Sequence, residues 1–119
     1  MERVMDVTLY GIRNCDTVKK ARAWLDANGT AYAFQDYKTV GVDAERLAGW
    51  VARLGWETLL NRRGTTFRKL PEEERGDLDA DKATALMIAH PSAIRRPVVE
   101  AGDALLVGFD AEVYAAQFG

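Results

Sequence analysis

The sequence contains one cysteine, Cys15, at the point where a short apolar run gives way to a helical pattern. The unpaired N–H groups at the start of a helix carry partial positive charge, which favours a thiolate over a thiol. Because the thiolate is the nucleophilic form, Cys15 is a candidate catalytic nucleophile. The alternative is that Cys15 is a small buried hydrophobic residue, as many free cysteines are.

Two charged neighbours bear on the acidity of this thiol. Lys19 lies one helical turn after Cys15, where side chains at i and i+4 share a face, and is expected to favour the thiolate. Asp16 is expected to oppose it, because a carboxylate disfavours a second negative charge. No second cysteine is present, so a redox cycle needs a thiol from outside the chain. One cysteine and one histidine also predict no disulfide framework and no metal site.

Arginines are the second group of residues suited to chemistry. Arg62, Arg63 and Arg68 crowd one loop, and Arg95 and Arg96 precede a proline. A guanidinium binds phosphate-like oxyanions and carboxylates through two parallel hydrogen bonds, which lysine does not reproduce. The alternative, for any one of them, is solvated surface charge.

Composition narrows the class of protein. The chain has 119 residues, 48% of them hydrophobic and 29% charged, which predicts one globular domain over residues 1–119. A net charge of -2 argues against nucleic-acid binding. The N-terminus does not resemble a secretory signal, and no segment approaches the roughly 20 apolar residues of a membrane span. We therefore expect a cytoplasmic protein that binds neither nucleic acid nor membrane.

The elements that position these residues follow from periodicity. Residues 7–12 predict a strand, Asn14 is the expected N-cap of a helix that stops at Gly29, and residues 31–37 predict a second strand. A parallel pair joined by the helix is the expected arrangement.

Later segments are predicted to be mostly helical and then extended. Asp43 and Asp79 are the expected caps of two helices, and residues 62–69 between them read as a basic loop. Strands are predicted around residues 98–99 and 104–107, with a last helix capped by Asp110. The order is βαβ, several helices, then ββα.

That order, with a cysteine opening the first helix, resembles a thioredoxin-like α/β fold with a helical insertion between the N-terminal βαβ and C-terminal ββα units. Three segments resemble the arsenate-reductase-like family, most closely its YffB-type branch: YGIRNCDTVKKA (residues 10–21), LLNRRGTTFRKL (59–70) and IRRPVV (94–99). Together they span nearly the whole chain.

The resemblance implies roles for five residues. Cys15 matches the nucleophile, and Asn14 with the helix N-terminus is expected to stabilise its thiolate. Asn14, Arg63, Arg96 and Pro97 are the expected glutathione-binding residues, with the two arginines at the anionic end of glutathione or substrate. Arg96 matches an arginine that holds the oxyanion in arsenate reductases. Arg63 matches the loop arginine of the YffB and Spx branches, whereas an ungapped match to arsenate reductases puts Asn61 there. Pro97 matches a proline that is usually cis beside the active cysteine; the alternative is an ordinary trans proline.

The resemblance also implies an activity, a glutathione-dependent thiol oxidoreductase. Glutathione would be the co-substrate, a glutaredoxin a further partner, and no cofactor would be bound. One alternative is a true arsenate reductase, but the third binding arginine of those enzymes is missing from the apolar terminal hairpin. The other is an Spx-like regulator that binds RNA polymerase; Val18 stands where the second cysteine of its CxxC switch would be.

Overall fold

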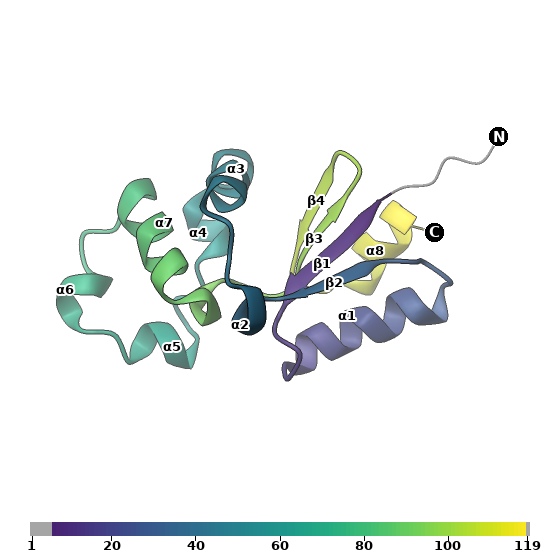
Figure 1. Ribbon diagram of the computed structural model, residues 1–119, viewed down its shortest axis with the longest axis horizontal. Helices are drawn as coiled ribbons and strands as arrows, with labels where there is room; N and C mark the ends of the chain where they lie inside the picture. The colour runs from purple at the N-terminus through teal and green to yellow at the C-terminus, as the bar shows by residue number, and fades with distance from the viewer. Residues whose placement is uncertain (1–5, 119) are drawn as a thin grey trace. The chain divides into compact units, whose positions relative to one another are not determined.

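The computed structural model describes residues 6–118 (Figure 1). They group into two compact units, the first made of residues 6–36 with 96–118 and the second of Tyr37–Arg95. The single domain expected over residues 1–119 stays a prediction. Among residues 6–118, no helix is both long and apolar enough to cross a membrane.

The first unit contains a four-stranded mixed sheet in the order β2-β1-β3-β4. Its strands are β1 (Val7–Gly11), β2 (Ala33–Asp36), β3 (Val98–Ala101) and β4 (Ala104–Val107). β1 runs parallel to β2 and antiparallel to β3, and β3 and β4 form an antiparallel hairpin. The expected βαβ and ββα units are confirmed.

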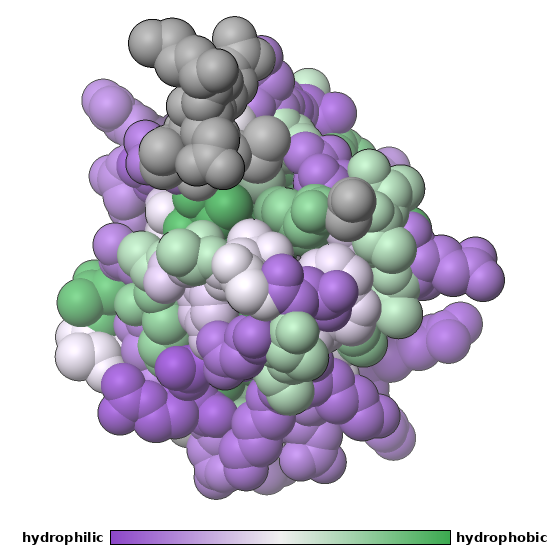
Figure 2. All heavy atoms as spheres, turned by 90° about the vertical axis from the view of Figure 1, so that its right-hand side faces the viewer, coloured by the Kyte–Doolittle hydropathy of each residue, from purple (hydrophilic) through white to green (hydrophobic). Residues whose placement is uncertain are grey.

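Two helices of this unit, α1 (Asp16–Ala27) and α8 (Ala111–Phe118), pack against the sheet (Figure 1). Their apolar positions join one buried cluster with the inward residues of β1 and β3: Val7, Leu9, Val18, Ala21, Leu25, Val99, Ala101 and Tyr114. Trp24 meets Tyr114 edge to face, with ring centroids 5.6 Å apart. Figure 2 shows apolar side chains among hydrophilic ones on the face that it presents.

The ends of these helices follow local signals. Gly29, with φ of +68°, comes directly after the C-cap of α1, in the left-handed conformation that glycine tolerates. The Asp110 carboxylate accepts a hydrogen bond from the N–H of Glu112 at 2.9 Å, which confirms it as the cap of α8.

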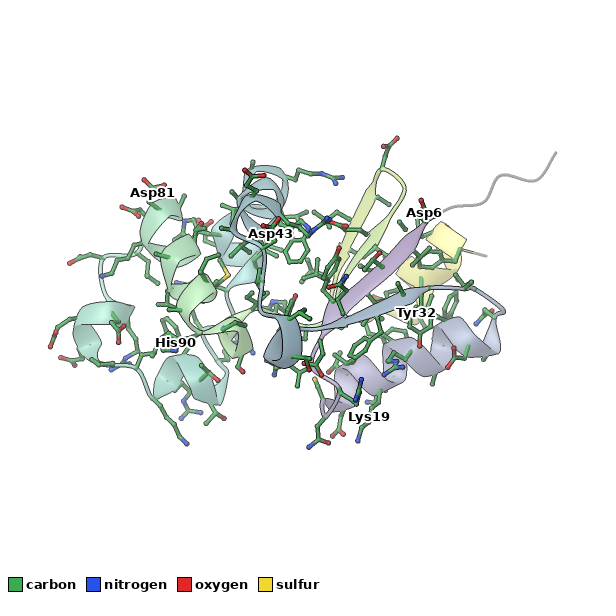
Figure 3. All side chains as sticks on the ribbon, in the orientation of Figure 1. Asp6, Lys19, Tyr32, Asp43, Asp81 and His90 are labelled. Atoms are coloured by element: carbon green, nitrogen blue, oxygen red, sulfur yellow. The ribbon has the colours of Figure 1, made fainter. Side chains whose placement is uncertain are left out.

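The second unit is helical. Its elements are α2 (Tyr37–Val40), α3 (Ala44–Leu54), α4 (Trp56–Leu59), α5 (Thr65–Arg68), α6 (Glu72–Arg75), α7 (Ala80–Ala89) and the 3-10 turn η1 (Pro91–Ala93). Asp43, which precedes α3 in Figure 3, accepts from the N–H of Arg46, and Asp79 accepts from the N–H of Lys82. Both predicted caps are confirmed.

Two predictions about this region were wrong. The second strand was expected to reach Tyr37, but β1 offers no pairing partner beyond Asp36, and Tyr37 begins α2 instead. Residues 62–69 were expected to form a loop, but they contain α5. Burial of Phe67 stabilises this single turn, which is too short to show a helical period in the sequence.

Gly11 permits the close approach of β1 and α1. A Cβ atom at Gly11 would lie 2.8 Å from Cγ2 of Val18, which is fully buried. We expect Gly11→Ala to lower the free energy of unfolding by about 1–3 kcal/mol, because the added methyl overfills this contact. Urea unfolding measures it.

Gly49→Ala is the matched control. Gly49 is exposed inside α3, and a Cβ there meets no atom within 4 Å. The substitution is expected to raise stability by about 0.5–1 kcal/mol, because glycine is unfavourable within a helix. Equal effects of the two substitutions would contradict the assigned contact.

Candidate active site

Cys15 lies between β1 and α1, at the end of a short loop. The strand ends at Gly11 and the helix begins at Asp16, so the thiol stands directly before the first turn of the helix. Its side chain is half-buried and packs against the core of the first unit. The thiol is therefore both held by packing and open to solvent.

The N-cap of α1 is Cys15, so the prediction that Asn14 caps this helix was wrong. Asn14 is exposed, and the helix begins one residue later than its polar side chain suggested. As a consequence, the thiol occupies the position where a serine or aspartate oxygen would face the first free N–H groups. The Cys15 side chain makes no capping hydrogen bond in the structure.

The surroundings of Cys15 lower the pKa of its thiol. Partial burial is the largest single influence and raises the pKa. The backbone N–H groups of Val18 and Thr17, together with the hydrogen bond and positive charge of Arg96, outweigh burial. Lys19 is exposed near the start of α1 (Figure 3) and is not among these groups, and neither is Asp16. The charge that matters comes from a distant part of the sequence.

The two consecutive arginines have different surroundings. The Nε of Arg95 donates to the carbonyl oxygen of Thr58 at 3.0 Å, so its guanidinium is engaged at α4. Arg96 is half-buried, and its side chain hydrogen-bonds Cys15. The structure thus selects Arg96 as the arginine beside the thiol.

The remaining predicted site residues lie as follows. Pro97 is buried, and the Arg96–Pro97 peptide bond is cis, as the resemblance implied. Arg63 belongs to the second unit, where its side chain is exposed and its N–H donates to Oδ1 of Asn61 at 3.3 Å. Its function stays a prediction.

Asp36 contacts the loop that carries Cys15, a contact that the sequence did not reveal. Its carboxylate, at the end of β2, accepts the N–H of Arg13 at 3.2 Å. The guanidinium of Arg13 lies 5.8 Å from the ring centroid of Phe34 on the same strand. Both contacts fasten the loop that carries Cys15 to β2. Because they join residues more than 20 positions apart, no local pattern predicts them.

The sequence of this chain matches a model of a known protein family. The model of the ArsC family matches residues 10–117, from the end of β1 to α8. The chain belongs to the ArsC family. The match includes Cys15, the cis proline and the basic segment of the second unit.

Individual relatives place this ArsC-family chain in the YffB branch. The structure of a YffB protein is 57% identical, with a TM-score of 0.93, and the match covers 95% of this chain and 99% of that one. An arsenate-reductase-related protein from Brucella melitensis is 52% identical with a TM-score of 0.77, covering 99% and 98%. An uncharacterized protein from Haemophilus influenzae is 38% identical over 94% of this chain and 98% of its own length.

The first prediction for the site concerns Arg96. Arg96→Gln removes the positive charge, and we expect the pKa of Cys15 to rise, so that alkylation at neutral pH slows several-fold. The rate of iodoacetamide alkylation across pH measures this. Lys19→Gln is the control and is expected to leave the profile unchanged. Equal slowing by both variants would mean that general charge, not the Arg96 contact, sets the acidity.

The second prediction concerns Asp36. Asp36→Ala and Asp36→Asn both remove the negative charge, but only asparagine keeps an oxygen that accepts the Arg13 N–H. We expect Asp36→Ala to slow alkylation of Cys15 relative to Asp36→Asn, because the loop loses its anchor. Both variants should keep a cooperative thermal transition. Identical pH profiles for the pair would show that the hydrogen bond does not position the thiol.

Proposed function

We propose that this ArsC-family protein is a glutathione-dependent thiol oxidoreductase with Cys15 as its nucleophile. The observation that carries the proposal is a solvent-accessible thiol at the start of α1 whose pKa is lowered by backbone N–H groups and by Arg96. Reactive cysteines lie in such electropositive, partly exposed surroundings, whereas buried structural cysteines are inert.

The reaction proceeds by two thiol–disulfide exchanges. The Cys15 thiolate attacks the glutathione sulfur of a mixed disulfide between glutathione and a substrate thiol. The substrate leaves as its thiolate, which takes a proton from solvent, and Cys15 becomes bonded to glutathione. A second glutathione thiolate then attacks that sulfur and releases the Cys15 thiolate with oxidised glutathione. In the sum of the two steps, the substrate half of the mixed disulfide is reduced to a thiol, and the one glutathione thiol that enters is oxidised to the disulfide level in oxidised glutathione.

The sequence supports the monothiol route. Cys15 is the only cysteine, and the position three residues on holds Val18, whose side chain is buried in the core. No thiol of this chain resolves the mixed disulfide, so an external thiol does. Glutathione fills this role in the proposal, with a glutaredoxin as a further partner.

Four further residues complete the proposed site, either because they lie near Cys15 or because they match residues of the family. Arg96 stabilises the thiolate before attack and the leaving thiolate afterwards. Asn14 and Pro97 flank the glutathione backbone, and Arg63 binds one of its carboxylates, a contact that suits the fork of a guanidinium.

Arsenate suits this site less well than glutathione. The chain has no arginine after Arg96, and β4 is the apolar segment Ala104–Val107. The matching hairpin of arsenate reductases supplies a third arginine. Loss of one charged donor costs about 1–3 kcal/mol, which is several-fold to a hundredfold in affinity.

The test of the proposed function is Cys15→Ser. Reduction of a glutathionylated peptide by glutathione is expected to vanish, because a serine hydroxyl does not form the mixed disulfide, while the circular dichroism spectrum stays unchanged. Wild-type protein is assayed in parallel with arsenate, glutathione and glutaredoxin, and little arsenate turnover is expected. Retained peptide reduction in Cys15→Ser, or efficient arsenate turnover by the wild type, would contradict the proposal.

A further inference from the structure

The second unit presents a basic hollow at α5. This hollow, of about 370 Å³, is lined by Thr65, Arg68 and Lys69. These residues are spaced i, i+3 and i+4, so one face of the helical turn carries all three. Phe67 is buried, so the opposite side of the turn faces the interior.

The backbone beneath the hollow is held from both sides. Before α5, the N–H of Asn61 donates to the carbonyl of Ala93 at 2.8 Å, and the Asn61 side chain lies against Gly64, where a Cβ would meet its Nδ2 at 2.7 Å. After α5, the Nε of Arg75 donates to the carbonyl of Leu70 at 2.9 Å. The backbone that carries the three lining side chains is therefore held in place. This lowers the entropic cost of ordering the site when a ligand binds.

The charge of this segment is one-sided. Residues 62–69 hold Arg62, Arg63, Arg68 and Lys69 and no acidic residue, in a chain of net charge -2. Within residues 6–118, neither Arg68 nor Lys69 has an ion pair or a side-chain hydrogen bond. Both charges thus remain available to an anion that enters the hollow.

We propose that this hollow binds the phosphate group of a small phosphorylated metabolite. A guanidinium, an ammonium and a hydroxyl offer donors to the three oxygens of one phosphate, and Arg68 supplies the fork that phosphate geometry suits. The hollow exceeds the volume of a phosphate and falls within the range of small-molecule sites, so it also has room for the remainder of a metabolite. This assignment is independent of thiol chemistry at Cys15.

The experiment uses the full chain with Cys15→Ser, which removes thiol reactivity. Inorganic phosphate and glycerol 3-phosphate are titrated separately while amide NMR shifts are followed. We expect saturable shifts at Thr65, Arg68 and Lys69 with both probes, and tighter binding of glycerol 3-phosphate because its carbon chain also enters the hollow. Tighter binding of inorganic phosphate would overturn the assignment to a phosphorylated metabolite.

Two double variants distinguish binding at this hollow from nonspecific attraction of phosphate to positive charge. Arg68→Ala/Lys69→Ala is expected to weaken phosphate binding at least about tenfold, since two charged donors are lost. Lys19→Ala/Lys20→Ala removes the same charge from the exposed face of α1 and is expected to leave binding unchanged. Linear, unsaturated shifts, or equal weakening in both double variants, would overturn the proposal.

Discussion

The contact between β1 and α1 is the constraint on which the proposed chemistry depends. The missing side chain of Gly11 lets Val18 pack against the end of the strand, so the first turn of α1 lies close to β1. Since the helix begins immediately after Cys15, the sulfur faces the first free N–H groups of α1. The same core that stabilises the first unit therefore determines the electrostatic environment of its only thiol.

The acidity of Cys15 is a balance between opposing influences. Packing against the core removes water from the sulfur and by itself raises the pKa. The N–H groups of Thr17 and Val18 and the guanidinium of Arg96 reverse that effect. A more deeply buried thiol would have a higher pKa and would not reach a substrate disulfide. A more exposed thiol would lie too far from the N–H groups and the guanidinium that stabilise the thiolate. Half-burial satisfies both requirements.

The sequence predicted most of the first unit and less of the site. Apolar runs and helical periods, with the cap at Asp110, indicated the βαβ and ββα units, and the caps at Asp43 and Asp79 indicated two helices of the second unit, because these signals are local. The helix start was misplaced by one residue because Asn14 is also a good capping residue. Lys19 was expected to tune the thiol, yet Arg96 does so from far along the chain. The anchor from Asp36 to Arg13 is equally long-range, and only the paired register of β1 and β2 brings those residues together.

The central claim is that Cys15 of the folded wild-type protein is a thiolate at lower pH than an ordinary cysteine. Titration of the ultraviolet thiolate absorbance, with the Cys15→Ser protein as blank, measures this directly. The account predicts a single midpoint below the value of about 8.5 typical of free cysteine, and loss of that shift in denaturant. A midpoint at or above the ordinary value in the folded protein would contradict it.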